Sequence, residues 1–489
     1  MRYTVAAGEK IRADVELSLV TGSLAENCED RAVLERCGFP GEDVAVLPEK
    51  GRIYVSIPSA DPERVRRGIA KAVDAIWAWN VRTLWMEPVI GEAAGTERAY
   101  AAIAEGFELS AYRFDRYRSD RKDFPIEEVF VADPGTYGLG ADREAAERGL
   151  AWGARLAAAT NWVRDMVNEI PGIMTPQRMA ELARGLAESE PAVTCDVYGR
   201  PALEEEGMNL FLAVNRASPL EPQLIHLCYR PEGTALERIA YVGKGITYDS
   251  GGLSLKPPEH MRNMKDDMGG AAAALGIVRA AAELKLPFEV HAVLGCTENM
   301  IGANAYRPDE IIRSHAGITV DVGNTDCEGR LVLADCLSWT ADHVKPDRMI
   351  DLATLTGAVC VGLGMFTTGV MGTSAETGFA FKRRAETSGE MYTVLEFNDY
   401  LGAMNDCPAA DVSNMPSGRT GGAITAGMFL ERFVPEALRG QWLHLDIGGT
   451  ADAEEQWGYF APGGTGAGVR GCIYHLMELA VEKGAEKWQ

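Results

Sequence analysis

The stretch Asn324-Thr-Asp-Cys-Glu-Gly-Arg330 concentrates two carboxylates, an arginine and a glycine in one short segment. A strand-like apolar run over residues 317–322 precedes it, and a helix-like run over residues 331–337 follows it. We therefore expect Asp326 and Glu328 to lie on a tight turn between a strand and a helix. Two acids one residue apart repel each other, so a buried turn of this kind requires a cation. A solvated turn whose acids cap the helix is the alternative.

A second, glycine-rich stretch adds further charged groups. It runs Tyr241-Val-Gly-Lys-Gly-Ile-Thr-Tyr-Asp-Ser-Gly-Gly-Leu-Ser-Leu-Lys-Pro257 and then Met264-Lys-Asp-Asp-Met-Gly-Gly270. It supplies Lys244, Asp249, Lys256 and Asp267 beside glycines, which let the backbone approach a ligand closely. Divalent metal ions bind carboxylate oxygens, so the two stretches together favour a metal site. Taken singly, each of these residues is typical of a surface turn.

Length and charge bound the class of protein. A chain of 489 residues is too long for one ordinary core, so we expect two domains. The net charge of −23 disfavours general affinity for nucleic acid or for an anionic membrane surface. The chain shows no leader-like start and no apolar run as long as a membrane span. Ten scattered cysteines without a CxxC pair favour reduced thiols in a cytoplasmic protein.

The order of the predicted elements indicates an α/β fold in two domains. We expect a small N-terminal α/β domain over residues 1–140, a linker helix over 141–170 and a catalytic domain over 171–489. In the third region strands and helices alternate, which predicts a mostly parallel central sheet flanked by helices. In such sheets ligands bind beyond the carboxyl ends of the strands, where we expect Lys244 and Asp267 to meet Asp326. The predicted helices include 62–79, 97–106, 141–169, 176–189, 270–284 and 468–482, and the predicted strands include 15–20, 43–47, 52–57, 224–229, 238–242, 288–294, 348–352 and 443–447.

These motifs resemble the M17 leucyl aminopeptidases, also called cytosol aminopeptidases. The segment from Asn324 to Leu331 matches the family signature around the metal-binding acids, with Cys327 where alanine is usual. Asp266 is a second departure, because the family usually has an apolar or aromatic residue there. The resemblance covers about residues 160–480 and includes Asp351-Leu-Ala-Thr-Leu-Thr-Gly-Ala358, Gly421-Gly-Ala-Ile-Thr-Ala-Gly427 and Gly466-Ala-Gly-Val-Arg470.

The resemblance implies an aminopeptidase that uses two divalent ions, Mn²⁺ or Zn²⁺. One ion would be bound by Asp249, Asp326 and Glu328, and the other by Lys244, Asp249, Asp267 and Glu328. A lysine that binds a metal must be neutral, and two adjacent cations would lower its pKa enough to allow that.

The resemblance also implies roles around the ions. Lys256 would stabilise the oxyanion that forms when water attacks the scissile carbonyl, and Arg330 would hold a bicarbonate that acts as the general base. Met264, Thr354 and Leu355 match positions that line the side-chain pocket and favour apolar first residues. A homohexamer acting on short peptides is implied as well. A dipeptidase of narrow specificity, for instance for cysteinyl-glycine, and a non-catalytic binding or chaperone role stay open as alternatives.

Overall fold

The computed structural model describes residues 1–6, 10–25, 28–40, 43–91, 95–137, 142–418 and 420–485. Within this part the chain forms two compact units, which are each described by themselves. Unit 1 comprises residues 1–161 and 454–462, and unit 2 comprises residues 162–453 and those from 463 onward. Both units combine helices with a sheet, which confirms the predicted α/β class with two domains. The predicted boundary at residues 140 and 141 and the predicted end at 489 lie outside the described residues.

Unit 1 is built on a six-stranded sheet whose order is β1-β6-β5-β2-β4-β3. Neighbouring strands are parallel except for the pair β3 and β4 at one edge. The strands are β1 (Arg2–Ala6), β2 (Val15–Thr21), β3 (Val44–Leu47), β4 (Arg52–Ile57), β5 (Thr83–Met86) and β6 (Glu128–Ala132). The sequence predicts β2, β3 and β4 and misses β1, β5 and β6.

The helices of unit 1 bury their apolar sides against this sheet and against each other. They are α1 (Arg31–Arg36), α2 (Pro62–Ile76), α3 (Gly95–Ala111) and α4 (Arg143–Asn168) as far as residue 161, with single turns at Pro48–Lys50 and Pro134–Tyr137. Helix α2 begins after Asp61, whose side chain accepts a hydrogen bond from the amide of Glu63, and Pro62 occupies the first helical position. Its residues Val65 and Ile69 are fully buried, as the helical periodicity predicts.

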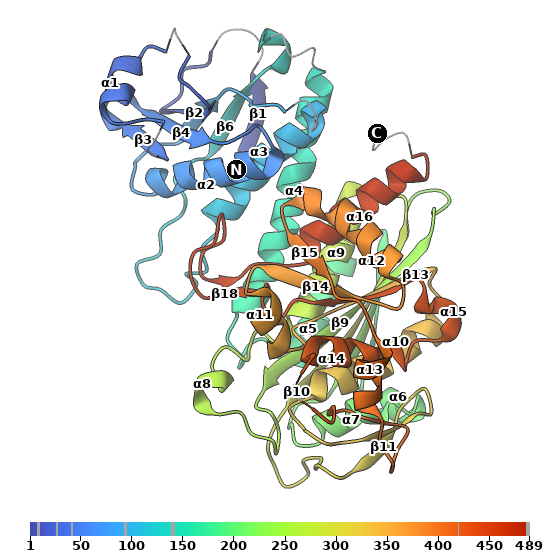
Figure 1. Ribbon diagram of the computed structural model, residues 1–489. Helices are drawn as coiled ribbons and strands as arrows, with labels where there is room; N and C mark the ends of the chain where they lie inside the picture. The colour runs from blue at the N-terminus through green and yellow to red at the C-terminus, as the bar shows by residue number, and fades with distance from the viewer. Residues whose placement is uncertain are drawn as a thin grey trace. The chain divides into compact units, whose positions relative to one another are not determined.

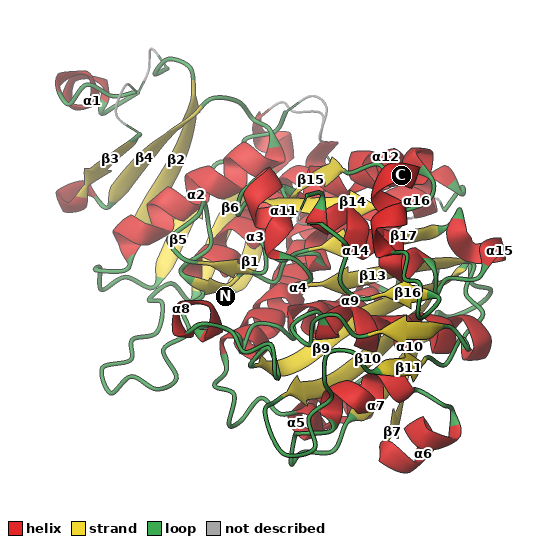
Figure 2. Ribbon diagram, turned by 60° about the horizontal axis from the view of Figure 1, so that its bottom comes forward, coloured by secondary structure: helices red, strands yellow, loops and turns green. Residues whose placement is uncertain are grey.

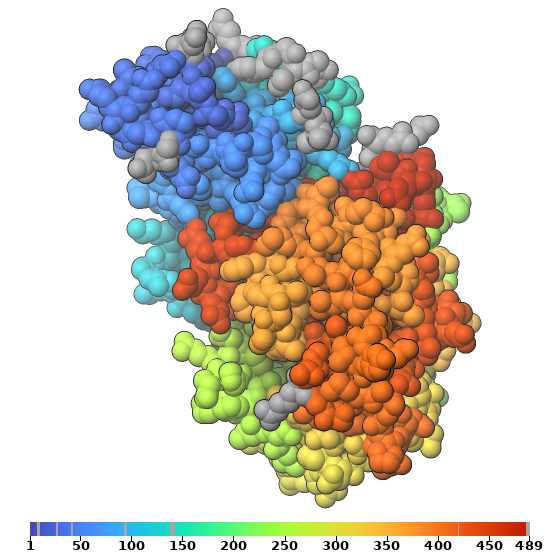
Figure 3. Space-filling view, viewed as in Figure 1, coloured from blue at the N-terminus to red at the C-terminus, as the bar shows by residue number. Residues whose placement is uncertain are grey.

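A segment from late in the chain, residues 454–462, completes unit 1. Tyr459 and Phe460 pack with Ala70 and Leu109 in a small apolar cluster. The side-chain amide of Gln456 donates a hydrogen bond of 2.7 Å to the carboxylate of Asp74. In Figure 3 this segment, coloured orange-red, lies against the blue surface of unit 1.

Unit 2 contains an eight-stranded sheet with the order β15-β14-β17-β13-β9-β10-β8-β7. Its strands are β7 (Val193–Tyr198), β8 (Gln223–Tyr229), β9 (Arg238–Asp249), β10 (Glu289–Asn299), β13 (Arg348–Ala353), β14 (Thr367–Met371), β15 (Met391–Val394) and β17 (Trp442–Asp446). The four central strands β17, β13, β9 and β10 are parallel, whereas β8, β7 and β14 join antiparallel to their inner neighbours. Figure 2 shows β9, β10 and β13 as a layer between helices.

The helices of unit 2 cover both faces of the sheet (Figure 1). They are α5 (Pro176–Ser189), α6 (Arg200–Glu205), α7 (Asn209–Asn215), α8 (Pro258–Met261), α9 (Gly269–Leu284), α10 (Glu328–His343), α11 (Gly357–Leu363), α12 (Ala375–Ala385), α13 (Asp399–Gly402), α14 (Gly422–Glu431), α15 (Glu436–Arg439) and α16 (Val469–Glu482). A side chain at Gly243 of β9 would meet Ala271 of α9, whereas one at Gly295 of β10 would meet Val332 of α10. Gly295 is paired with Lys244, the residue after Gly243, so α9 and α10 lie on opposite faces.

The structure corrects two expectations about the strands that lead to the site. Strand β9 does not end near residue 242 but continues to Asp249, so Lys244 lies within the strand rather than after it. The strand before the acidic turn is β12 (Thr319–Asp321), which pairs with β11 (Ile311–Arg313) and β16 (Val412–Ser413) in a separate small sheet. A fourth sheet consists of β18 (Asp452–Ala453) and β19 (Gly463–Gly464). In the described ranges no helix has the length and apolarity needed to cross a bilayer.

Candidate metal centre

The site begins with a lysine that projects from the middle of a buried strand. Lys244 lies in β9, and its side chain passes over Gly329 in the first turn of α10. A Cβ atom at position 329 would lie 2.5 Å from Cε of Lys244, so any other residue there would block the lysine. The Lys244 ammonium therefore reaches the start of α10 because that turn carries a glycine.

Lys244 connects acids from two different elements. Its Nζ lies 2.6 Å from Oδ1 of Asp267, which precedes α9, and 3.0 Å from Oε1 of Glu328, the first residue of α10. The same Nζ donates to the backbone carbonyl of Thr354 at 2.9 Å, and the Thr354 hydroxyl donates to Oδ1 of Asp267 at 2.8 Å. The loop after β13 thus holds Asp267 in place from the side opposite α10.

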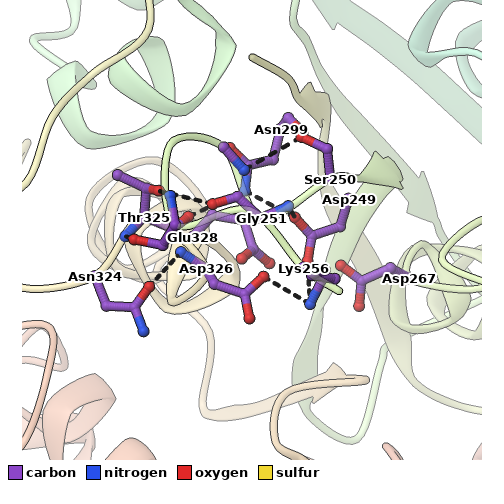
Figure 4. Close-up of polar contacts among 12 residues, drawn as sticks. Asp249, Ser250, Gly251, Lys256, Asp267, Asn299, Asn324, Thr325, Asp326 and Glu328 are labelled. Carbon is purple, nitrogen blue, oxygen red and sulfur yellow. Dashed lines mark hydrogen bonds and ion pairs between the residues drawn. The ribbon is translucent and has the colours of Figure 1, made fainter. Parts of the chain in front are cut away.

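A second lysine joins the remaining two acids. Nζ of Lys256 lies 2.9 Å from Oδ2 of Asp249 and 2.7 Å from Oδ1 of Asp326 (Figure 4). Asp326 lies in the turn before α10, as the sequence predicts, and its amide donates to the side chain of Asn324 at 2.8 Å. Gly251 has a φ of 85° and turns the chain beside Asp326, which brings the loop carrying Lys256 over the acids.

The structure also shows residues that the sequence interpretation missed. Asn299 at the end of β10 donates to Oδ1 of Asp249 at 2.7 Å and to the carbonyl of Thr325 at 3.0 Å. Asn414 accepts from the amide of Gly323 at 2.8 Å and donates to the carbonyl of Asn324 at 2.7 Å. These two asparagines orient the turn that carries Asp326 and Glu328, and Asn299 also orients Asp249. No sequence signal marks them, because a single asparagine shows no periodicity.

Burial and like charges act together on the acids. Burial, followed by the charges of Glu328 and Asp249, raises the pKa of Asp267 well above its usual range, although Lys244 opposes this shift. Burial and the charge of Asp249 also raise the pKa of Glu328 and of Asp326. Burial alone would lower the pKa of Lys244, but the neighbouring acids more than reverse this effect and raise it. The centre therefore contains more negative charge than its two lysines neutralise.

Unpaired oxygen atoms also indicate an excess of negative charge at the centre. Oδ2 of Asp267 and Oε2 of Glu328 are buried and have no hydrogen-bond partner among the described residues. Asp249, Asp326 and Glu328 each present one oxygen, and these three atoms lie within 4.8 Å of one another. Buried acceptors without donors cost free energy unless a cation is bound. This set of donor atoms fits hard or borderline divalent ions.

Arg330 lies next to the acids but is bound differently. Its Nη1 donates to the backbone carbonyl of Asn414 at 2.8 Å, and its guanidinium lies 5.9 Å from the ring centroid of Phe429. Its Nε is buried and has no hydrogen-bond partner in the described part of the chain. A buried guanidinium with a spare donor suits a small anion.

The predicted pocket residues differ in how closely they join the acids. Thr354 contacts Asp267 directly, and the amide of Leu355 donates to Asp446 at the end of β17 at 3.1 Å. Met264 is half-buried in the loop before α9, where its amide donates to the carbonyl of Met261 at 3.3 Å.

The two departures from the family pattern lie at the edges of the centre. Burial and the charge of Asp452 raise the pKa of Asp266 to about 7, whereas the adjacent Asp267 faces Lys244. Cys327 is half-buried directly before α10, and burial raises the pKa of its thiol despite the nearby Arg330. A raised pKa keeps the thiol protonated and weakly nucleophilic.

Comparison with known proteins places the chain in a family. The family model described as "Cytosol aminopeptidase family, catalytic domain" matches residues 161–473, and the one for the N-terminal domain of the same family matches residues 56–121. A protein of Campylobacter jejuni described as "Probable cytosol aminopeptidase" is 43% identical over 472 residues, which cover 96% of this chain and 97% of the relative. A relative from Aquifex aeolicus with the same description is 44% identical over 78% of this chain and 74% of its own length.

Solved structures agree with this assignment. The bottromycin maturation enzyme BotP in complex with Mn matches with a TM-score of 0.84 and 32% identity, over 96% of this chain and all of the other. A mutant of tomato leucine aminopeptidase matches with a TM-score of 0.84 and 28% identity, over 98% of this chain and 96% of the other. The fold and the acid–lysine centre therefore define a metal-dependent exopeptidase. The chain belongs to the cytosol aminopeptidase family, M17, and is an aminopeptidase, as the sequence motifs predict.

Proposed function

We propose that this aminopeptidase removes apolar N-terminal residues from short peptides and uses two divalent ions, Mn²⁺ or Zn²⁺. The observation that carries the proposal is the excess of buried carboxylate over lysine at the centre, with Oδ2 of Asp267 and Oε2 of Glu328 left without donors. The Mn complex of BotP supports manganese as one of the ions that such a site accepts. Exchangeable ions suit a set of ligands that is mostly oxygen.

The ligands divide into two sets that share two acids. Asp249, Asp326 and Glu328 would hold one ion, and Lys244 with Asp267 would hold the other together with Asp249 and Glu328. Oxygen atoms of the first set already lie within 4.8 Å of one another. Lys244 contacts Asp267 and Glu328 as an ammonium and would bind an ion only after losing its proton. Metal and proton therefore compete at Lys244.

The residues around the ions would perform the proton and charge chemistry. Divalent ions at such a site lower the pKa of water and polarise a carbonyl oxygen. Lys256 keeps its charge, because the surrounding acids raise its pKa against the effect of burial, and it would donate to the developing oxyanion. Arg330 would use its spare Nε donor to hold a bicarbonate that takes the proton from the attacking water.

Substrate selection follows from the acids and the loops beside them. A free α-amine is the group that distinguishes the first residue of a peptide, and the ion held by Lys244 and Asp267 would receive it. Thr354, Leu355 and Met264 would line the pocket for the first side chain, which favours apolar residues. We further propose a homohexamer in the cytoplasm, with no nucleic-acid or membrane partner. All ten cysteines lie in the described part of the chain and none is in a disulfide, which suits the reducing cytoplasm.

A metal add-back screen tests the function. The protein is treated with a chelator, metal content is measured, and Mn²⁺, Zn²⁺, Co²⁺ or Mg²⁺ is added before aminoacyl and dipeptide substrates are offered. We expect no hydrolysis without metal, recovery with Mn²⁺ or Zn²⁺, and the highest kcat/KM for apolar first residues. Full hydrolysis by a demonstrably metal-free protein would contradict the proposal. Activity restricted to cysteinyl-glycine would contradict the broad apolar preference.

A further inference from the structure

Three side chains meet at the end of α10 that lies away from the metal centre. They are Glu206, which follows α6, His315 in the hairpin between β11 and β12, and His343, the last residue of α10. Their donor atoms all lie within 4.8 Å of one another. We propose that this trio, which we name the α10 clip, binds a transition-metal ion of the Zn²⁺ or Ni²⁺ type, independently of the aminopeptidase centre.

Hydrogen bonding determines which nitrogen of His315 is free. The Ser338 hydroxyl lies 3.0 Å from the carbonyl of Ala334 and 3.1 Å from that of Asp335, which both can take its hydrogen, so Nδ1 of His315, 3.1 Å away, is well placed to donate to the hydroxyl oxygen. The carboxylate of Asp342, at 4.0 Å from the same Nδ1, is a second acceptor on that side. Nδ1 therefore carries the hydrogen, and Nε2 of a neutral His315 presents its lone pair to the carboxylate of Glu206 at 3.6 Å. Two acceptors that face each other need a proton or a metal ion between them, and the second imidazole, that of His343 at 3.0 Å from the same Glu206 oxygen, favours a metal ion.

The spacing of the donor atoms fits a single ion. Oε2 of Glu206 lies 3.0 Å from Nε2 of His343 and 3.6 Å from Nε2 of His315. Metal–ligand bonds of about 2.1 Å in a tetrahedron separate neighbouring ligand atoms by roughly 3.4 Å. The two distances lie on either side of this value. Three protein ligands at a partly exposed position leave a fourth place for water.

The clip is held in position by buried groups behind it. The amide of His315 donates to Oδ1 of the fully buried Asp335 at 2.9 Å. The ring of His343 stacks on buried Trp339, with 4.6 Å between centroids and 18° between planes. Such outer contacts orient metal ligands. The last turn of a helix also favours a positive charge, which adds to the attraction of Glu206.

A second cluster with similar residue types shows a histidine whose two ring nitrogens both have hydrogen-bond partners. Nε2 of His291 lies 2.8 Å from Glu289, while its Nδ1 lies 2.9 Å from Nε2 of His226. There each ring nitrogen of His291 faces a complementary partner, so hydrogen bonds close the chain and no metal is needed. At the α10 clip, by contrast, the hydrogen on Nδ1 is already used by Ser338 and the lone pair on Nε2 faces an acid.

The two sites differ in the ions they prefer. Two imidazoles and one carboxylate favour Zn²⁺, Ni²⁺ or Co²⁺ over Mn²⁺, whereas the aminopeptidase centre is rich in oxygen. Helix α10 carries Glu328 at its first residue and His343 at its last. An ion at the clip would tie α6, the β11–β12 hairpin and α10 together and thereby stabilise unit 2.

Zinc stoichiometry in a set of variants tests this proposal. Full-length wild type, His315→Gln, His343→Gln and the control Glu205→Gln are dialysed against micromolar Zn²⁺, and zinc per chain is measured by elemental analysis. Glu205 is exposed and adjacent to Glu206, so its replacement alters charge without touching the clip. We expect one zinc fewer in each histidine variant and no change in the control. Circular dichroism confirms that each variant is folded.

A second background separates the clip from the aminopeptidase centre. Asp326→Ala removes an acid of that centre and is compared with the double variant Asp326→Ala/His343→Gln. We expect zinc to raise the Tm of the single variant and not that of the double variant, which binds one zinc fewer. Equal zinc content and equal Tm shifts in these two proteins would overturn the proposal, whatever the fate of the aminopeptidase centre.

Discussion

Two buried aspartates of this molecule experience opposite surroundings. Asp30 in unit 1 accepts hydrogen bonds from Lys50, from Nη1 of Arg52 at 2.8 Å and from the Tyr54 hydroxyl at 2.9 Å. Burial raises its pKa, but these donors outweigh burial and lower the pKa to about 2. Asp267 in unit 2 has Lys244 and the Thr354 hydroxyl as donors and two acids as neighbours, and its pKa is raised.

The number of hydrogen-bond donors relative to neighbouring acids distinguishes the structural carboxylate of Asp30 from the carboxylate of Asp267 at the candidate metal centre. Around Asp30 two cations and a phenol meet one buried carboxylate, so the charge is satisfied by the protein itself. Around Asp267 burial and like charge act in the same direction, and unpaired oxygens are left. A protein retains such an arrangement where a ligand supplies the missing positive charge. The comparison predicts that substitution of Asp267 affects metal binding and catalysis, whereas substitution of Asp30 affects stability.

The largest effect is expected for Asp267→Asn. This change removes one negative charge and one ligand from the second ion set, so we expect loss of one metal equivalent per chain. A bound ion contributes several kcal/mol to the transition state, which corresponds to on the order of 10³ or more in kcat. Elemental analysis and steady-state kinetics on the purified variant measure both quantities. Two retained metal equivalents with normal kcat would remove Asp267 from the ligand set.

The second-largest effect on kcat is expected for Lys256→Ala. Removal of a donor to the oxyanion typically costs about 10²–10³ in kcat, while metal content should stay near that of the wild type. The control is Arg262→Ala, an exposed cation in the same segment, which should leave kcat unchanged. Lys256→Ala could instead lose bound metal and yet keep the wild-type kcat once metal is saturating. The role of Lys256 would then be to hold Asp249 and Asp326 rather than to contact the substrate.

Asp30→Asn tests the prediction that the carboxylate of Asp30 serves stability rather than catalysis. Loss of a buried charged acceptor costs about 1.5–3 kcal/mol of unfolding free energy, with little change in kcat at saturating metal. Because the folded pKa is lowered to about 2, the carboxylate contributes stability above its unfolded pKa and loses it as the pH falls toward 2. Urea unfolding at neutral pH and at pH 3, with the exposed Asp43→Asn as control, should show the difference at neutral pH and a smaller one at pH 3. An equal difference at both values would contradict this assignment of charge.

The sequence predicts the stretches that carry the acids and lysines of the centre because their signals are local. Acids, lysines and glycines lie together over residues 241–270 and 324–330, where the glycine-rich pattern indicates close approach of the backbone. The sequence predicts too short a strand around Lys244 because Gly243 and Gly245 interrupt its apolar run. The structure needs both glycines, since a side chain at 243 would collide with α9 and one at 245 with β10.

Contacts between distant residues could not be predicted in this way. Asn414 holds Gly323 from a position 91 residues further along the chain, and Asn299 reaches Asp249 from the adjacent strand. A single asparagine shows no periodicity and no turn motif that announces such a partner. The return of residues 454–462 to unit 1 is hidden for the same reason, because it depends on packing around Tyr459 and Phe460.

The smallest effect is expected for Asp266→Asn. Asp266 and Asp267 are adjacent, but only Asp267 is within ion-pair distance of Lys244, at 2.6 Å. The backbone of Asp266 keeps its bonds in the variant, because its amide donates to Asn263 and its carbonyl accepts from Gly269, both at 2.8 Å. The side chain lies near Asp452, so asparagine relieves repulsion without removing a ligand. We expect both metal equivalents and a kcat within about threefold of the wild type, since polar changes that remove no contact usually cost little. Metal content and kcat are measured for Asp266→Asn and Asp267→Asn side by side. If Asp266→Asn lost metal and activity while Asp267→Asn kept both, the ligand would be Asp266, one residue earlier in the chain.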